Sequence, residues 1–288
     1  MYTYEIKKLP KRTTEVLLKI PKTDIEKERE AAFNALQKEL SVEGFRKGKV
    51  PKQIAEKHLS KDVIYQELLK SILSRIYDEV VKKENLQPVI SPKIELTKAK
   101  EGEDWEVKIS LAEKPTVELG SYKEAIKKMK AEEKKGDIWV PGKNEEKKEE
   151  DSEKKQKQLN MLLTTLLKEV KCDISDLLVD EELDRRLTQL VDDVRKIGLT
   201  VENYLKSKNL TIDDLKNRYK KEIEDTYKLE FVLMEVADKE NVKVEKTELD
   251  KLFANIASEA EKKAAQENAY YYASILRKQK TLDFLLGL

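Results

Sequence analysis

A run of cations surrounds one aromatic residue between Glu43 and Gln53, in the sequence E-G-F-R-K-G-K-V-P-K-Q. Four basic side chains and no acidic one lie between Gly44 and Gln53, although the whole chain has 58 basic and 57 acidic residues. Cations around one apolar ring suit docking on an anionic or mixed surface, with the ring as the buried contact. A solvated basic loop between two helices is an equally weighted alternative. The residues of the docking hypothesis are Gly44, Phe45, Arg46, Lys47, Gly48, Lys49, Pro51 and Lys52.

Two glycines and a proline frame this run. Gly44 and Gly48 permit backbone angles that would strain other residues. Pro51 has its φ preset for the first turn of a helix, so we expect a helix to start there. Phe45 has little around it to bury against in such a loop. The pattern predicts a rigid loop that presents one apolar anchor and several cations.

The remaining side chains do not predict an active site. His58 is the only histidine and lies on a charged helical stretch, which favours a surface histidine over a catalytic one. Cys172 is the only cysteine, which excludes an intramolecular disulfide, fits a reducing compartment and cannot complete a zinc site with one histidine. The acidic clusters at 145–146 and 180–182 indicate solvated faces rather than paired catalytic carboxylates. We therefore predict no catalytic residue, no metal and no cofactor.

Nucleotide-binding and targeting signals are also missing from the sequence. It contains no G-x-G-x-x-G, G-x-x-x-x-G-K-[ST] or G-x-S-x-G motif. The net charge of +1 predicts that any contact with nucleic acid is local. The N-terminus has no apolar stretch of signal-peptide length, and no window approaches the roughly 18 apolar residues of a membrane span. We expect a cytoplasmic protein with no membrane partner.

Strands are predicted near both ends of residues 1–113, and the domain to which they belong would carry the basic loop. Residues 2–20 alternate with period two around a turn at Leu9–Arg12, which predicts a hairpin ended by Pro21. A strand through residues 94–96 and a second one that alternates over 105–111 follow later. Together with three helices between the hairpin and these strands, the order predicts an α+β domain with helices on one face of an antiparallel sheet.

The helices of this region have recognisable starts. Thr23 and Glu26 have the spacing of a capping box, which predicts a helix that begins at Thr23. Ser60 opens a longer helix whose apolar residues recur every four positions from Ile64 to Val80. The basic loop lies between these two predicted helices.

Residues 114–157 contain few apolar residues, which predicts a linker that is partly helical and partly flexible. A domain needs at least about 50 residues with a core of its own. This stretch offers too few apolar groups for such a core, namely Ile126, Met129, Ile138, Trp139 and Val140.

Residues 158–288 predict an all-α domain, so the chain is mostly helical overall. Gly198 and Asn241 are expected to end helices, and Thr200, Thr211 and Thr247 to open them. The helices have apolar faces but many charges, so we expect accessible apolar grooves between them.

The basic loop resembles the ribosome-binding signature of the trigger factor family, bacterial chaperones that meet nascent chains at the ribosomal tunnel exit. The similar stretch is 44–51, G-F-R-K-G-K-V-P, and further similarity lies at 118–123, 166–174 and 183–187. The resemblance implies that Phe45, Arg46 and Lys47 contact a protein at the exit port. It implies that Lys49 and Lys52 lie nearer to ribosomal RNA.

The chain departs from the family pattern at the position of one domain. Trigger factors usually insert an FKBP-type prolyl isomerase domain between the N-terminal domain and the helical arms. Here the stretch 114–157 occupies that place, between a ribosome-binding domain at 1–113 and a substrate-binding domain at 158–288. We therefore predict a member of the family without isomerase activity.

The resemblance implies an ATP-independent chaperone whose partners are the ribosome and nascent or unfolded polypeptides. It leaves open whether the free protein forms a homodimer. Two rivals are a ribosome-associated factor that binds no client and a trigger factor that retains isomerase activity. Packing between arm helices is an equally weighted role for each predicted client-binding residue. These residues are Leu252, Phe253, Ile256, Tyr270, Tyr271 and Tyr272.

Overall fold

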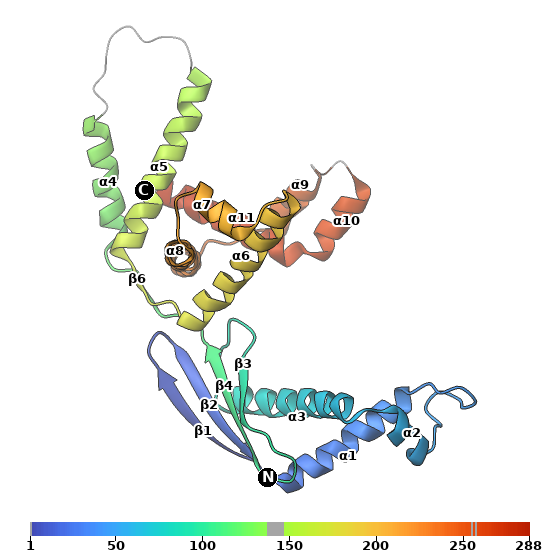
Figure 1. The fold of residues 1–288 in the computed structure, drawn as a ribbon. Helices are drawn as coiled ribbons and strands as arrows, with labels where there is room; N and C mark the ends of the chain where they lie inside the picture. Colours follow the sequence, from blue (N-terminus) through green and yellow to red (C-terminus); the bar gives the residue numbers. More distant parts are fainter. Residues whose placement is uncertain (1, 137–146, 255, 257) are drawn as a thin grey trace. The chain divides into compact units, whose positions relative to one another are not determined.

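The computed structural model describes residues 2–136, 147–254, 256 and 258–288 (Figure 1). These residues form two compact units. The first comprises Met1–Lys114 with Ser175–Leu178, and the second comprises Pro115–Ile174 with Val179–Leu288. Each unit has its own buried apolar core, so the packing of each explains its own fold.

The sheet of the first unit has antiparallel strands in the spatial order β1-β2-β4-β3. Val16 pairs with Ile109, and Leu18 pairs with Val107. Because side chains alternate between the two faces of a strand, these four residues share one face, and all four are buried. The predicted hairpin and antiparallel sheet are confirmed. The strands are β1 (Thr3–Leu9), β2 (Thr13–Ile20), β3 (Lys93–Lys98) and β4 (Trp105–Ala112).

Helices cover the buried face of this sheet. Apolar residues of α1 and α3 join those of β2 and β4 in one core, which confirms the predicted α+β arrangement. The Ser60 hydroxyl accepts a hydrogen bond from the Val63 amide and caps α3, as its sequence position predicted. The helices are α1 (Lys22–Glu39), α2 (Lys52–His58) and α3 (Lys61–Lys83).

The predicted capping position of α1 at Thr23 is wrong by two residues, because the N-cap is Pro21. The helix begins at Lys22 after Pro21, which has no side chain that could cap it, and the Asp104 carboxylate instead accepts a hydrogen bond from the Lys22 amide at 3.0 Å. The carbonyl of Pro21 accepts hydrogen bonds from the amides of Asp24 and Ile25. Proline already has a φ compatible with helix entry, so the chain turns directly from the strand into the helix.

The second unit is mainly helical, with one short pair of strands, β5 and β6. Its core joins residues of α4, α5, α8 and α11, which confirms the predicted helical C-terminal part. Its elements are β5 (Val117–Glu118), α4 (Tyr122–Gly136), α5 (Lys147–Glu169), β6 (Lys171–Cys172), α6 (Asp176–Lys196), α7 (Val201–Ser207), α8 (Ile212–Lys239), α9 (Lys246–Ala254), α10 (Glu259–Glu267) and α11 (Ala269–Gly287).

Most predicted helix ends of this unit are confirmed. Gly198 follows α6 with a φ of +75°. Thr200 accepts a hydrogen bond from the Asn203 amide. Thr211 and Asp214 form a reciprocal capping box at the start of α8.

The predicted cap at Thr247 is wrong, because α9 begins at Lys246. The Glu248 carboxylate accepts a hydrogen bond from the Glu245 amide at 2.8 Å. Glu248 lies three residues after Glu245 and satisfies the amide of this residue, which precedes the helix, so the helix begins before the threonine.

The described part of the predicted linker packs into the second unit. Tyr122, Ile126 and Met129 are buried with Leu162 and Leu166 of α5. Their spacing of four and three places them on one face of α4. The residue pattern predicted a helix here but not the element against which it packs. Ile138, Trp139 and Val140, which were counted in the same stretch, lie outside the described residues.

Candidate docking loop and apolar surfaces

The basic run lies in the loop between α1 and α2, at the end of α1 away from the sheet (Figure 1). The Phe45 amide donates to the Val42 carbonyl at 3.0 Å, and the Lys49 amide donates to the Arg46 carbonyl at 2.9 Å. These bonds close two successive turns. The loop is therefore a folded backbone segment with a defined outward side.

Val50 anchors the end of this loop. It is only 2% exposed and packs in a small core with Phe33, Ala55 and Ile64. The side-chain amide of Gln37 donates a hydrogen bond to the Val50 carbonyl at 2.7 Å. The loop is thus held by α1, α2 and α3 together, which restricts how far its exposed side chains can move.

The two glycines serve different needs. Gly48 has a φ of +76°, and a Cβ there would lie 2.8 Å from the Lys38 carbonyl oxygen. Gly44 has a φ of +87°, but an added Cβ would meet no described atom within 4 Å. Gly48 is required by both conformation and close approach, and Gly44 by conformation alone.

The predicted docking side chains gather on the outer side of the loop. Phe45 is 39% exposed, and Arg46, Lys47 and Lys49 are exposed beside it. Among the described residues, no carboxylate forms an ion pair with these three cations. Lys52 is also exposed, and its ammonium lies 5.7 Å from the ring centre of Phe33. The loop thus presents an apolar ring together with uncompensated positive charge.

The predicted client-binding residues fall into two groups. Phe253 is only 4% exposed and meets Tyr272 edge to face, with ring centres 5.6 Å apart. Ile256 is half-buried in the segment after α9. Tyr270 is 90% exposed, and Leu252 and Tyr271 are exposed as well. Phe253 therefore has the position of a packing residue, and the exposed residues remain available for contact.

A pocket lies between α8 and α11, where the sequence predicted accessible apolar grooves between helices but not which helices form them. It has a volume of about 350 Å³, and its wall includes Leu233, Ala237, Val244 and Tyr270. The spacing of apolar residues predicts which face of each helix is apolar. It does not predict that these two faces pack against each other and leave a gap.

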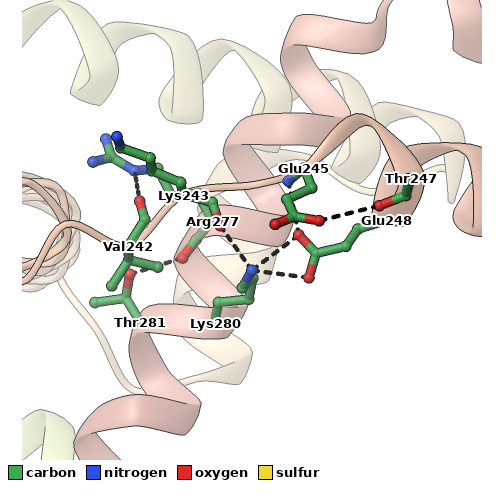
Figure 2. Close-up of polar contacts among 8 residues, drawn as sticks. All are labelled: Val242, Lys243, Glu245, Thr247, Glu248, Arg277, Lys280 and Thr281. Carbon is green, nitrogen blue, oxygen red and sulfur yellow. Dashed lines mark hydrogen bonds and ion pairs between the residues drawn. The ribbon is translucent and has the colours of Figure 1, made fainter.

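Polar contacts fasten the Val242–Glu248 segment, which includes the pocket wall residue Val244, to α11 (Figure 2). Arg277 donates to the Val242 carbonyl at 2.9 Å. Lys280 donates to the Lys243 carbonyl at 2.7 Å and pairs with the Glu248 carboxylate at 2.8 Å. These bonds hold the wall segment against α11, and Arg277 itself also lines the pocket.

The side chains considered for chemistry have ordinary structural environments. His58 is exposed at the end of α2, as predicted. Cys172 is half-buried, and burial raises the pKa of its thiol to about 11, so the thiol is protonated near neutral pH. Within the described ranges, no cluster of three His, Cys, Asp or Glu side chains is arranged to hold a metal ion. None of the described helices combines the length and apolar character needed to cross a membrane.

Two family models match most of the chain. The model described as "Bacterial trigger factor protein (TF)" matches residues 2–138, and "Bacterial trigger factor protein (TF) C-terminus" matches residues 142–287. Only residues 139–141 lie between the two matches. Since a domain needs at least about 50 residues, a further domain does not fit between them.

Curated relatives and a solved structure agree with these matches. A trigger factor of Lactococcus lactis (strain IL1403) is 38% identical over 106 residues, which are 37% of this chain and 25% of that protein. One of Streptococcus pneumoniae (strain Hungary19A-6) is 36% identical over 104 residues, which are 36% of this chain and 24% of that protein. The aligned stretch thus spans about a quarter of each relative's length.

The solved structure is described as "Promiscuous Substrate Recognition in Folding and Assembly Activities of the Trigger Factor Chaperone". It has a TM-score of 0.58 and 15% identity, and the match covers 98% of this chain and 99% of that one. At this identity the similarity concerns the fold alone. With family models matched across both of its units, the chain belongs to the trigger factor family.

Proposed function

We propose that this chain is an ATP-independent molecular chaperone that docks at the ribosomal tunnel exit and holds hydrophobic segments of nascent polypeptides. The observation that carries the proposal is the anchored loop with its exposed Phe45 and unpaired cations. Membership of the trigger factor family supports the same role.

In the docked state, different side chains of the loop would contact different parts of the ribosome. Phe45, Arg46 and Lys47 contact a protein at the exit port, because an apolar ring flanked by cations suits a mixed surface. Lys49 and Lys52 face nearby ribosomal RNA, since compact ammonium groups bind phosphates well. The anchored backbone lowers the conformational entropy that docking would cost.

Client holding would rely on many weak apolar contacts. Tyr270, Tyr271 and Leu252 are exposed on the second unit and supply part of this surface. Contacts of this kind give low sequence specificity and fast release, which suits a holding function that uses no nucleotide.

The proposal divides the chain into three parts. Residues 1–113 dock on the ribosome, 114–157 stand in place of the isomerase domain, and 158–288 contact the client. We propose that the chain does not catalyse prolyl isomerisation and acts in the cytoplasm. The short interval between the two family matches supports the first point.

Co-sedimentation with ribosomes tests the docking step. The variant F45A/R46A/K47A should lose co-sedimentation and retain suppression of the aggregation of an unfolded test protein. A matched control is K7A/K8A/L9A, because Leu9 is 40% exposed and follows two exposed lysines in β1. This control should co-sediment normally. Unchanged co-sedimentation of the loop variant would remove the docking assignment.

The same assays separate the two rival functions. A ribosome-associated factor without a client would co-sediment but would not suppress aggregation. A retained isomerase would accelerate a proline-limited refolding reaction, whereas we expect the uncatalysed rate.

A further inference from the structure

An open groove of about 750 Å³ runs between α4 and α5, two helices of the second unit that lie side by side (Figure 1). It is distinct from the docking loop and from the exposed tyrosines of α11. Its residues recur at helical spacing along both helices, so each helix contributes one continuous stripe.

The floor of the groove is apolar and adaptable. Met129, which is buried, and Met161, which is half-buried, lie on it together with Ala125. The Thr165 hydroxyl, also in the lining, donates to the Met161 carbonyl at 2.8 Å, so it needs no partner from a ligand. Methionine side chains adapt to varied apolar shapes.

Among the described residues, three of the four charged side chains that line the groove are basic and exposed, and we call this exposed part of the lining its rim. Lys128, Lys157 and Lys168 line it, with Glu132 as an opposing charge. Among the residues whose side chains the structure describes, no carboxylate forms an ion pair with any of these three lysines. A ligand with carboxylates beside its apolar groups would therefore complement both the rim and the floor.

The spacing of the cations sets the size of the ligand. Lys157 and Lys168 are eleven residues apart on α5, which corresponds to about 17 Å along a helix. About five extended residues, or about three turns of helix, span this distance. The groove is too long for a single side chain and fits a short polypeptide segment.

We propose that the α4–α5 groove binds polypeptide segments in which apolar residues are flanked by aspartate or glutamate. The proposal rests on the chaperone function above, because the occupant is a client segment. It adds a preference for charge in the client that the exposed tyrosines, as neutral side chains, do not supply.

Fluorescence anisotropy with two labelled peptides of about twelve residues tests the preference on the full chain. Both peptides have the same central apolar residues; one is flanked by Asp and Glu and the other by Lys. The acidic peptide should bind about tenfold more tightly at low salt, an effect of the size of three exposed ion pairs. The difference should shrink as salt increases.

Variants locate the binding in the groove. K128E/K157E/K168E should reverse the preference, and the control K206E/K208E/K221E should keep it, because its exposed lysines lie on α7, its C-cap and α8. M161Q should weaken the binding of both peptides and leave the ratio of their affinities unchanged. Circular dichroism checks that each variant is folded, and the peptide comparison on the unmodified chain stands even if one is not.

Equal affinity for the two peptides would overturn the proposal, as would an unchanged preference in K128E/K157E/K168E. An anionic oligonucleotide that competes as well as the acidic peptide would also overturn it, since it would show binding by charge alone. Aggregation suppression without any peptide preference would reject the groove and leave the chaperone function intact. A preference for the acidic peptide without aggregation suppression would support the groove and reject the chaperone function.

Discussion

Gly48 lies directly against the backbone of Lys38, so close that a Cβ at position 48 would be 2.8 Å from the Lys38 carbonyl oxygen. The contact joins the middle of the basic loop to the last turn of α1. It explains how a loop rich in cations keeps one shape, because mutual repulsion of its charges is opposed by close packing of its backbone.

Replacing Gly48 with alanine should therefore destabilise the first unit. A left-handed φ and a backbone clash together cost about 2 kcal/mol of unfolding free energy. Gly44→Ala is the control and should cost about 1 kcal/mol, since only its φ is unfavourable. Urea titration followed by fluorescence of the buried Trp105, in a Trp139→Phe background, measures both values. Equal effects of the two variants would contradict the role given to the close contact.

Phe253→Ala and Tyr270→Ala should separate packing from contact. Loss of the buried Phe253 ring should lower the unfolding free energy by about 3 kcal/mol. Loss of the Tyr270 ring, which is 90% exposed, should change it by less than about 0.5 kcal/mol and should weaken aggregation suppression. Thermal unfolding and a light-scattering assay measure the two effects. A stable Phe253→Ala variant with poor suppression would instead make Phe253 a client contact.

Cys172 should make stability depend on alkaline pH. Burial raises the pKa of the folded thiol to about 11, above its ordinary value of about 8.5. The resulting stabilisation is fully present below the ordinary value and is lost as the pH rises through about 11. Denaturation at several alkaline pH values should show this loss, and Cys172→Ala should reduce it. Near neutral pH the folded protein should also react with iodoacetamide far more slowly than the unfolded chain, and equal rates would refute the assignment.

Lys280→Met should loosen the segment that walls the pocket between α8 and α11. It removes the bonds from Lys280 to the Lys243 carbonyl and the Glu248 carboxylate (Figure 2). Hydrogen exchange over Val242–Glu248 should become faster, with Lys263→Met as the control on α10. The hydrogen bond from Lys280 lowers the pKa of Glu248, so in the unmodified chain this contact is lost as the pH falls through that lowered value. Unchanged exchange would show that the segment is held by other contacts.

Several local features were predictable because neighbouring residues decide them. The alternation in β2 and β4 predicted the buried face of the sheet, and Ser60, Thr200 and Thr211 predicted helix starts that are confirmed. The two predicted starts that are wrong, at Thr23 and Thr247, lie where another nearby group already satisfies the helix end. In the docking loop, the glycines and the outward cations could be read from residue type and spacing.

The sequence by itself determined the order of helices and strands, the family signature at residues 44–51 and the scarcity of catalytic side chains. Only the tertiary structure decided that Val50 anchors the loop, that Phe253 is buried while Tyr270 is exposed, and that α4 packs on α5. The reason is physical: periodicity reports which face of an element is apolar, whereas burial depends on which other element covers that face. The groove between α4 and α5 is a property of two faces meeting, and neither helix contains it alone.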